Sequence, residues 1–172
     1  ISVGRCGYIV RLYAAQYPQD VVGVVLLDSA HPEMGDRLLS VLPPKTLFEP
    51  LTLKAWRIYG EYLARSDGAN PKDTEGVDIV SSWAQVKAAP ELGDLPLVVI
   101  TRNPQNPILA AGMPDLPEEI NTRALQMWQQ AQKELLDLST HSTQVFADHA
   151  GHYIQGEEPL LVDEALKRLR QA

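Results

Sequence analysis

Uninterrupted apolar runs mark two places in this sequence, and each run predicts a buried strand. Residues 21–27 (VVGVVLL) and 97–101 (LVVIT) are β-branched or aliphatic at nearly every position. Strands that are apolar on both faces are typical of the centre of a parallel sheet with helices on both sides. A shorter run over 143–147 (TQVFA) predicts one last strand near the C-terminal end.

Between these runs, apolar residues recur every three to four positions, which predicts helices. Residues 7–17 (GYIVRLYAAQY) have this spacing, and Pro18 ends the helix because the residue before a proline is pushed out of the helical region. We predict a long helix over 117–138, with Pro117 in its first turn, and a last helix over 158–171. Strands that alternate with helices indicate an α/β fold with a parallel sheet.

Residues 33–93 follow a different pattern, without a strand signal. Three short helical patterns are separated by prolines and by a Ser-Asp-Gly sequence, over residues 34–42, 51–65 and 77–88. A helical insertion of this size between two parallel strands is typical of a cap or lid. We therefore expect a core of residues 1–32 and 94–172, and a helical cap over 33–93.

The composition is that of an ordinary globular protein, with 172 residues, of which 45% are hydrophobic and 22% charged. A net charge of −7 argues against a nucleic-acid partner, because phosphate binding needs clustered Lys and Arg. No apolar stretch approaches the roughly 18 residues of a membrane span. The single cysteine, Cys6, excludes an internal disulfide and slightly favours the cytoplasm, and we expect it to be a small buried thiol.

The chain opens at Ile1 without Met. We therefore expect an N-terminal portion to precede it, and a signal for export or anchoring would lie in that portion.

Polar residues that are able to take part in catalysis or binding follow the predicted strands. An open parallel sheet binds its ligands at this edge. These polar residues are Asp28, Arg102 with Asn103, and His149 with His152. We expect His152 to be a general base, because histidine suits that role at neutral pH and the preceding glycine lets the loop turn tightly. His149 is the alternative. No Cys or His pair has zinc-ligand spacing and no phosphate-binding glycine motif is present, so we expect no metal and no cofactor.

Two segments carry a resemblance to a known family. RLYAAQYPQDVVGVVLLDSAHPE (11–33) and ADHAGHYIQGEEPLLVDEAL (147–166) resemble bacterial α/β-hydrolase-fold proteins of the lipase, esterase and peptidase type. The first is similar to the helix after the nucleophile elbow and the next strand, and the second to the stretch that carries the catalytic histidine. The resemblance implies a partial α/β-hydrolase fold, with a nucleophile, an acid and His152 in that order along the chain.

For the nucleophile, the resemblance implies Ser2. The family's elbow is G-x-S-x-G, a sharp turn from strand to helix, and Ile1-Ser2-Val3-Gly4 supplies x-S-x-G. The amide of Val3 would then form half of the oxyanion hole.

Two alternatives to Ser2 stay open. The relatives run S-x-G-G directly into the helix. If Gly7 and Tyr8 are kept in register without a gap, Gly4 falls on the serine position and no nucleophile exists. Cys6 has Gly4 two residues before it, but Tyr8 stands where the second glycine belongs.

For the triad acid, the resemblance leaves Asp28 and Asp115. Asp28 ends the strand over 21–27, and after the strand over 97–101 no carboxylate occurs until Asp115. Asp148 is too close to His152 along one loop to orient it easily. In relatives, an aspartate at the position of Asp28 can instead support loop hydrogen bonds.

The resemblance thus predicts a serine hydrolase that cleaves a carboxylic-ester or peptide bond of a small-molecule substrate, provided that the preceding portion is present. Ser2 would attack, His152 would take its proton, and Asp28 would hold the imidazole. The alternatives are a catalytically inactive fragment and a noncatalytic binding member of the same fold. Structural or cap-lining roles are expected for seven further residues: Arg11, Ser29, His31, Trp56, Tyr59, Tyr62 and Trp83.

Overall fold

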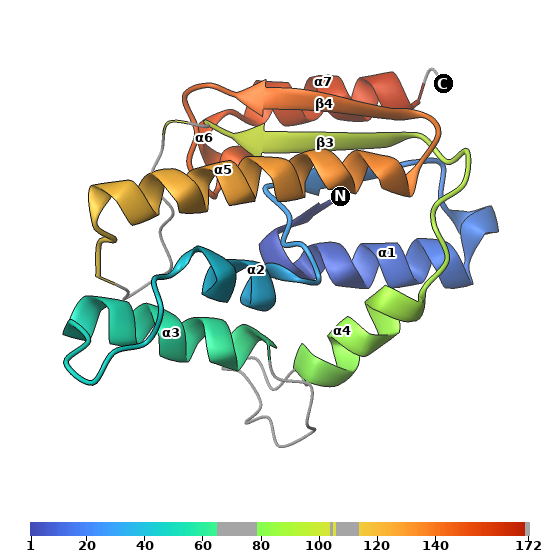
Figure 1. Cartoon of the computed structure of the whole chain (residues 1–172). Helices are drawn as coiled ribbons and strands as arrows, with labels where there is room; N and C mark the ends of the chain where they lie inside the picture. Colours follow the sequence, from blue (N-terminus) through green and yellow to red (C-terminus); the bar gives the residue numbers. More distant parts are fainter. Residues whose placement is uncertain (65–78, 104, 106–113, 171–172) are drawn as a thin grey trace.

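The computed structural model describes residues 1–64, 79–103, 105 and 114–170 (Figure 1). In these residues, four parallel strands form one sheet in the order β1-β2-β3-β4. The strands are β1 (Ser2–Val3), β2 (Val24–Leu27), β3 (Leu97–Arg102) and β4 (Ser142–Ala147). The α/β class and the parallel sheet predicted from the sequence are confirmed.

Every residue of β2 and β3 is buried, as their continuous apolar sequences predict. The two strands lie side by side, with Val24 opposite Leu97 and Leu27 opposite Ile100. By contrast, β4 is at one edge of the sheet and is only partly buried, which explains its more polar sequence.

Helices cover both faces of the sheet (Figure 1). On one face, the side chains of Val25, Val98 and Ile100 pack against α7 (Pro159–Leu169) and the short α6 (Ile154–Glu157). On the other face, the alternate strand residues pack against α1 (Gly7–Gln16) and Leu135. Leu135 opens a 3-10 turn (Leu135–Leu138) that follows α5 (Glu118–Glu134). The predicted helix over 117–138 is therefore two elements, while the last predicted helix agrees with α7 within two residues.

Three helices lie between β2 and β3 in the chain: α2 (Met34–Val41), α3 (Leu51–Ala64) and α4 (Ile79–Ala88). Among the described residues this stretch contains no strand, in agreement with the predicted helical insertion. Its aromatic residues pack inside the helical layer: Trp56 is buried, and its indole N–H donates to the Pro114 carbonyl at 2.6 Å. Tyr59 and Tyr62 are partly buried against the neighbouring clusters. The side chain of Trp83 is outside the described residues.

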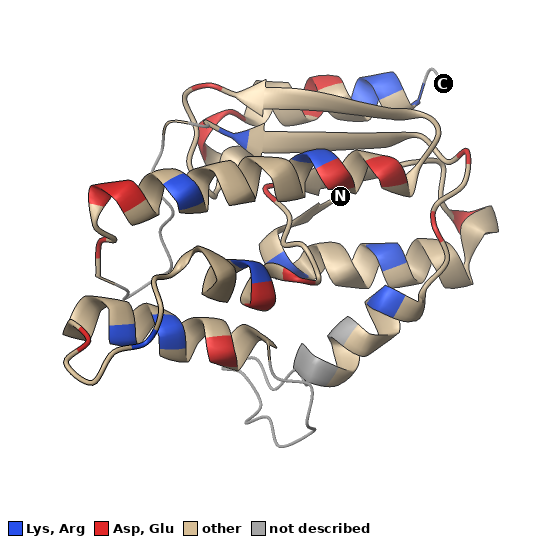
Figure 2. Ribbon diagram, viewed as in Figure 1, with Lys and Arg blue, Asp and Glu red and all other residues tan. Residues whose placement is uncertain are grey.

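Figure 2 shows acidic and basic residues spread over several helices and loops, with both signs present on most of the long helices. Over the described ranges, none of the helices has both the length and the apolar character required to cross a bilayer.

Candidate active site

The carboxyl ends of β2, β3 and β4 lie at the same edge of the sheet, because the three strands are parallel and in register. Asp28 directly follows β2, and its amide donates to the Ile100 carbonyl of β3 at 2.8 Å. The loop after β4 is bound to the end of β3 through Asn103, whose amide donates to the Ala150 carbonyl at 3.1 Å. The polar residues that the sequence places after separate strands are therefore neighbours in space.

At this edge, Asp28 and His152 form a hydrogen-bonded pair. The carboxylate oxygen Oδ2 of Asp28 is 2.7 Å from Nδ1 of the His152 imidazole. An ionised carboxylate only accepts hydrogen bonds, so this bond requires a proton on Nδ1, and a neutral ring then has its lone pair on Nε2. Asp28 is 1% exposed, whereas the side chain of His152 is 42% exposed. A buried acceptor thus orients an imidazole whose other nitrogen is free to accept a proton.

The backbone and a buried cation together hold Asp28 in place. Asp28 has φ of 42°, in the left-handed region that aspartate tolerates better than bulkier residues. Its second oxygen, Oδ1, lies 3.8 Å from Nε of Arg102, which forms an ion pair without a hydrogen bond. The Arg102 guanidinium in turn lies 5.1 Å from the centroid of the Trp128 ring. Sequence reasoning noted Arg102 at a strand end but did not predict that it would balance the buried carboxylate.

Opposite the Asp28 side of the imidazole lies Gly4, in the turn between β1 and α1. A Cβ atom on Gly4 would be 3.0 Å from both Nε2 and Cε1 of His152. Gly4 has φ of 54°, a conformation that glycine adopts without steric cost. Its carbonyl accepts hydrogen bonds from the Ser29 hydroxyl and the Ala30 amide, each at 3.1 Å. The loop after β2 therefore holds this turn against the imidazole.

The same loop also explains why residue 7, the first residue of α1, is a glycine. A Cβ atom on Gly7 would be only 1.9 Å from Oγ of Ser29. Ser29 is itself buried, and its carbonyl accepts a hydrogen bond from the Gln132 side chain of α5 at 2.6 Å. The expected supporting role of Ser29 is thus visible as a chain of contacts from α5 to the turn at Gly4.

Ser2 is not bonded to His152. It lies inside β1, paired with Leu26, where it is 8% exposed, and its hydroxyl has no hydrogen-bond partner among the described residues. Val3 follows in the same strand and pairs with Leu27. The structure brings together Asp28 and His152 of the expected triad, and leaves the expected Ser2 in the strand.

The remaining candidates lie around this pair. Asp115 is exposed ahead of α5, while the carboxylate that contacts His152 is that of Asp28. Cys6 is exposed in the 3-10 turn between β1 and α1, so the expectation of a buried thiol is wrong. His149 is also exposed, and its amide donates to a carboxylate oxygen of Glu158 at 2.8 Å.

Two glutamates that sequence reasoning missed hold the His152 loop. The Gly151 amide donates to Glu157 at 2.7 Å, and the His149 amide donates to Glu158. The only sequence signal for this role is an acidic pair shortly after the loop, which is also common on solvated helix ends.

Sequence reasoning also expected supporting roles for His31 and Arg11, and His31 has contacts of that kind. The His31 carbonyl accepts a hydrogen bond from the Tyr8 hydroxyl, and its ring nitrogen Nδ1 accepts one from the Glu33 amide. Burial lowers the pKa of His31, and the nearby Arg37 adds to this effect. Burial also lowers the pKa of Arg11. The contacts of His31 fit the expected supporting role, and Arg11 is buried.

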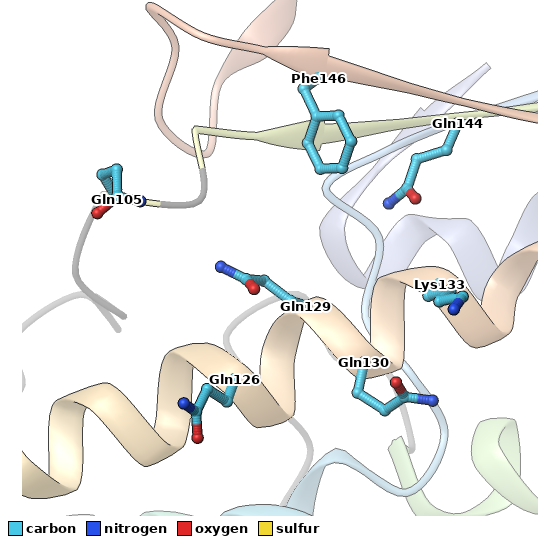
Figure 3. Close-up of a pocket in the computed structure, with 7 residues that line it drawn as sticks. All are labelled: Gln105, Gln126, Gln129, Gln130, Lys133, Gln144 and Phe146. Atoms are coloured by element: carbon cyan, nitrogen blue, oxygen red, sulfur yellow. The ribbon is translucent and has the colours of Figure 1, made fainter.

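A separate cavity of about 460 Å³ lies between α5 and β4 (Figure 3). Its walls are glutamines, together with Lys133 and Phe146, and they include neither Asp28 nor His152. No cluster of three or more potential metal ligands occurs in the part of the chain that the structure describes.

In comparisons with known proteins, no family model, no curated protein and no solved structure matches this chain.

Proposed function

We propose that this chain is a hydrolase of the α/β-hydrolase fold that cleaves an ester or amide bond, with His152 as its general base. The observation that carries this proposal is the hydrogen bond of 2.7 Å between Asp28 and Nδ1 of His152. The pair lies beyond the carboxyl ends of parallel strands, where open α/β sheets bind their ligands. An imidazole that is oriented by a buried carboxylate and whose side chain is partly exposed is suited to moving a proton to and from a reacting group.

Each residue of the pair has a defined role in this proposal. Nε2 of His152 takes a proton from the attacking group and later gives it to the leaving alcohol or amine. Asp28 fixes the tautomer and stabilises the imidazolium that forms in between. Arg102, 3.8 Å from the other carboxylate oxygen, places a positive charge beside Asp28.

The arrangement of elements supports the same family. A strand turns sharply into α1 at Gly4, the acid follows β2, and the histidine follows β4, which is the chain order of nucleophile position, acid and base in this fold. We propose that the helical insertion between β2 and β3 serves as a cap. A cap there would limit the size of the acyl or aryl group that reaches His152.

A second candidate function is a noncatalytic binding protein of the same fold. Gly4 favours it, because the residue that faces Nε2 of His152 has no side chain to attack a carbonyl. Such a protein would keep the Asp28–His152 pair as a polar element of a ligand site and would release its ligand unchanged.

Hydrolysis of p-nitrophenyl acetate and butyrate separates the two functions. We expect His152→Ala to lower kcat/KM by about 10²-fold or more, the range typical of a general base. His141→Gln is the matched control: His141 is bound to Asp94 at the other end of β4, so its loss leaves the rate unchanged. Equal rates in the wild type and His152→Ala contradict the hydrolase and leave the binding protein.

A further inference from the structure

We infer that Gly4 occupies the nucleophile position of this site, and that His152 therefore activates a water molecule instead of a side chain of the turn. The inference rests on the proposed hydrolase function and names its attacking group. A side-chain nucleophile must lie within about 2.6–3.2 Å of the base nitrogen. Residue 4 is the position whose side chain would meet Nε2: a Cβ atom there would already be 3.0 Å from that nitrogen, which is tighter than an ordinary van der Waals contact.

The backbone at Gly4 also has the shape of a nucleophile-bearing turn. In α/β hydrolases the nucleophile sits on a sharp, strained turn from a strand into a helix. Gly4 follows β1 directly, has φ of 54° and opens the 3-10 turn that leads into α1. The hydrogen bonds from Ser29 and Ala30 to its carbonyl hold this turn without any contribution from a side chain at position 4.

Ser2 does not compensate for the glycine. Its hydroxyl is buried in β1 and is not bonded to His152. With Gly4 at the nucleophile position, the amide that follows it belongs to Arg5 and not to Val3, to which sequence reasoning gave the oxyanion role.

Water can supply the missing nucleophile without a covalent enzyme intermediate. Nε2 of His152 accepts a proton from water as the water oxygen bonds to the substrate carbonyl carbon, and the carbonyl electron pair moves to its oxygen. The tetrahedral species then collapses: the bond to the leaving group breaks, and the proton on Nε2 passes to the leaving oxygen or nitrogen. Ester and water give acid and alcohol, no acyl-enzyme forms, and His152 returns to its initial state.

A fluorophosphonate probe tests this directly, because it reacts with a base-activated serine and not with water-bound imidazole. We expect the wild type to stay unlabelled and Gly4→Ser to gain one phosphonyl group on residue 4, detected by intact mass and peptide mapping. The His152 side chain is 42% exposed and can shift by the few tenths of an ångström that the new Cβ requires. Gly4→Ser/His152→Ala removes the base and should lose the label. Gly4→Ala carries the same Cβ without a hydroxyl and should remain unlabelled.

Proteins that keep Gly4 provide a second test, which does not depend on the folding of the Gly4 variants. Ser2→Ala should hydrolyse p-nitrophenyl butyrate at the wild-type rate, and wild-type protein quenched during turnover should show no acyl adduct by mass. Labelling or acylation of Ser2 or Cys6 in the wild type overturns the inference, as does a folded Gly4→Ser variant that stays unlabelled. Failure of the hydrolase proposal itself gives a different result. The wild type would then hydrolyse the ester at the same rate as His152→Ala, whether or not Gly4→Ser is labelled.

Discussion

Replacing Arg102 by Met should destabilise the protein sharply, because it leaves the Asp28 carboxylate buried without a cation. Arg102 is 6% exposed and Asp28 is 1% exposed, so neither charge is well solvated. The methionine keeps an apolar side chain of similar length and removes the guanidinium, and with it the contact of the guanidinium with the Trp128 ring. The hydrogen bond of Asp28 to His152 does not involve Arg102 and is kept in this variant.

The magnitude follows from the geometry of the pair. Two unit charges at the 3.8 Å that separate Nε of Arg102 from Oδ1 of Asp28 attract by about 4 kcal/mol at an effective dielectric constant of about 20. Removing one partner of a buried pair typically costs about 3–5 kcal/mol. We therefore expect the free energy of unfolding to fall by about 3 kcal/mol and Tm to fall by about 6–12 °C for a chain of this length.

A double-mutant cycle with Asp28→Asn measures the ion pair itself. Urea unfolding of the wild type, the two single variants and Asp28→Asn/Arg102→Met gives the coupling free energy. We expect about 2–3 kcal/mol, because the double variant no longer buries an unpaired charge. A coupling below about 0.5 kcal/mol, within the usual error of additivity, would refute the reasoning that Arg102 balances an ionised Asp28.

Two further predictions concern acid stability and the turn. Burial holds the pKa of His31 below its usual 6.5, and the hydrogen bond from Arg37 lowers the pKa of Glu134. The unfolded chain therefore binds protons that the folded chain does not, so Tm should decrease as the pH falls below 6.5 and then further as Glu134 is protonated. His31→Gln should remove the decrease between pH 6.5 and 5, and an unchanged profile argues against this cause. Gly7→Ala should cost about 1–3 kcal/mol by urea unfolding, because its Cβ would be 1.9 Å from Oγ of Ser29. Ser29→Gly should relieve most of that cost, and equal destabilisation with and without Ser29 would count against the contact.

The sheet could be predicted from the sequence because its central strands are buried on both faces. A run such as VVLL in β2 has no polar position to place in solvent, so the pattern alone identifies it. The helix predicted over 117–138 failed at its end for a related reason: the leucines of the 3-10 turn Leu135–Leu138 continue the apolar pattern, although the backbone tightens there. Periodicity reports which side chains are apolar and cannot distinguish a last helical turn from a 3-10 turn.

The candidate site could be predicted only in part. Asp28 and His152 follow strands, so the topology of a parallel sheet places both at one edge. The nucleophile position could not be assigned, because the sequence around Gly4 allows more than one register. What distinguishes the registers is a long-range contact: residue 4 faces Nε2 of His152, at the far end of the chain.

The tautomer of His152 tests the central claim most directly. If Nδ1 donates to the buried Asp28 carboxylate, long-range ¹H–¹⁵N spectra at pH 8 should show a proton on Nδ1, shifted far downfield, and an unprotonated Nε2. His152→Gln assigns the signal by its loss. A neutral His152 ring that carries its proton on Nε2 would contradict the account, because the base nitrogen that faces Gly4 would then have no lone pair to accept a proton.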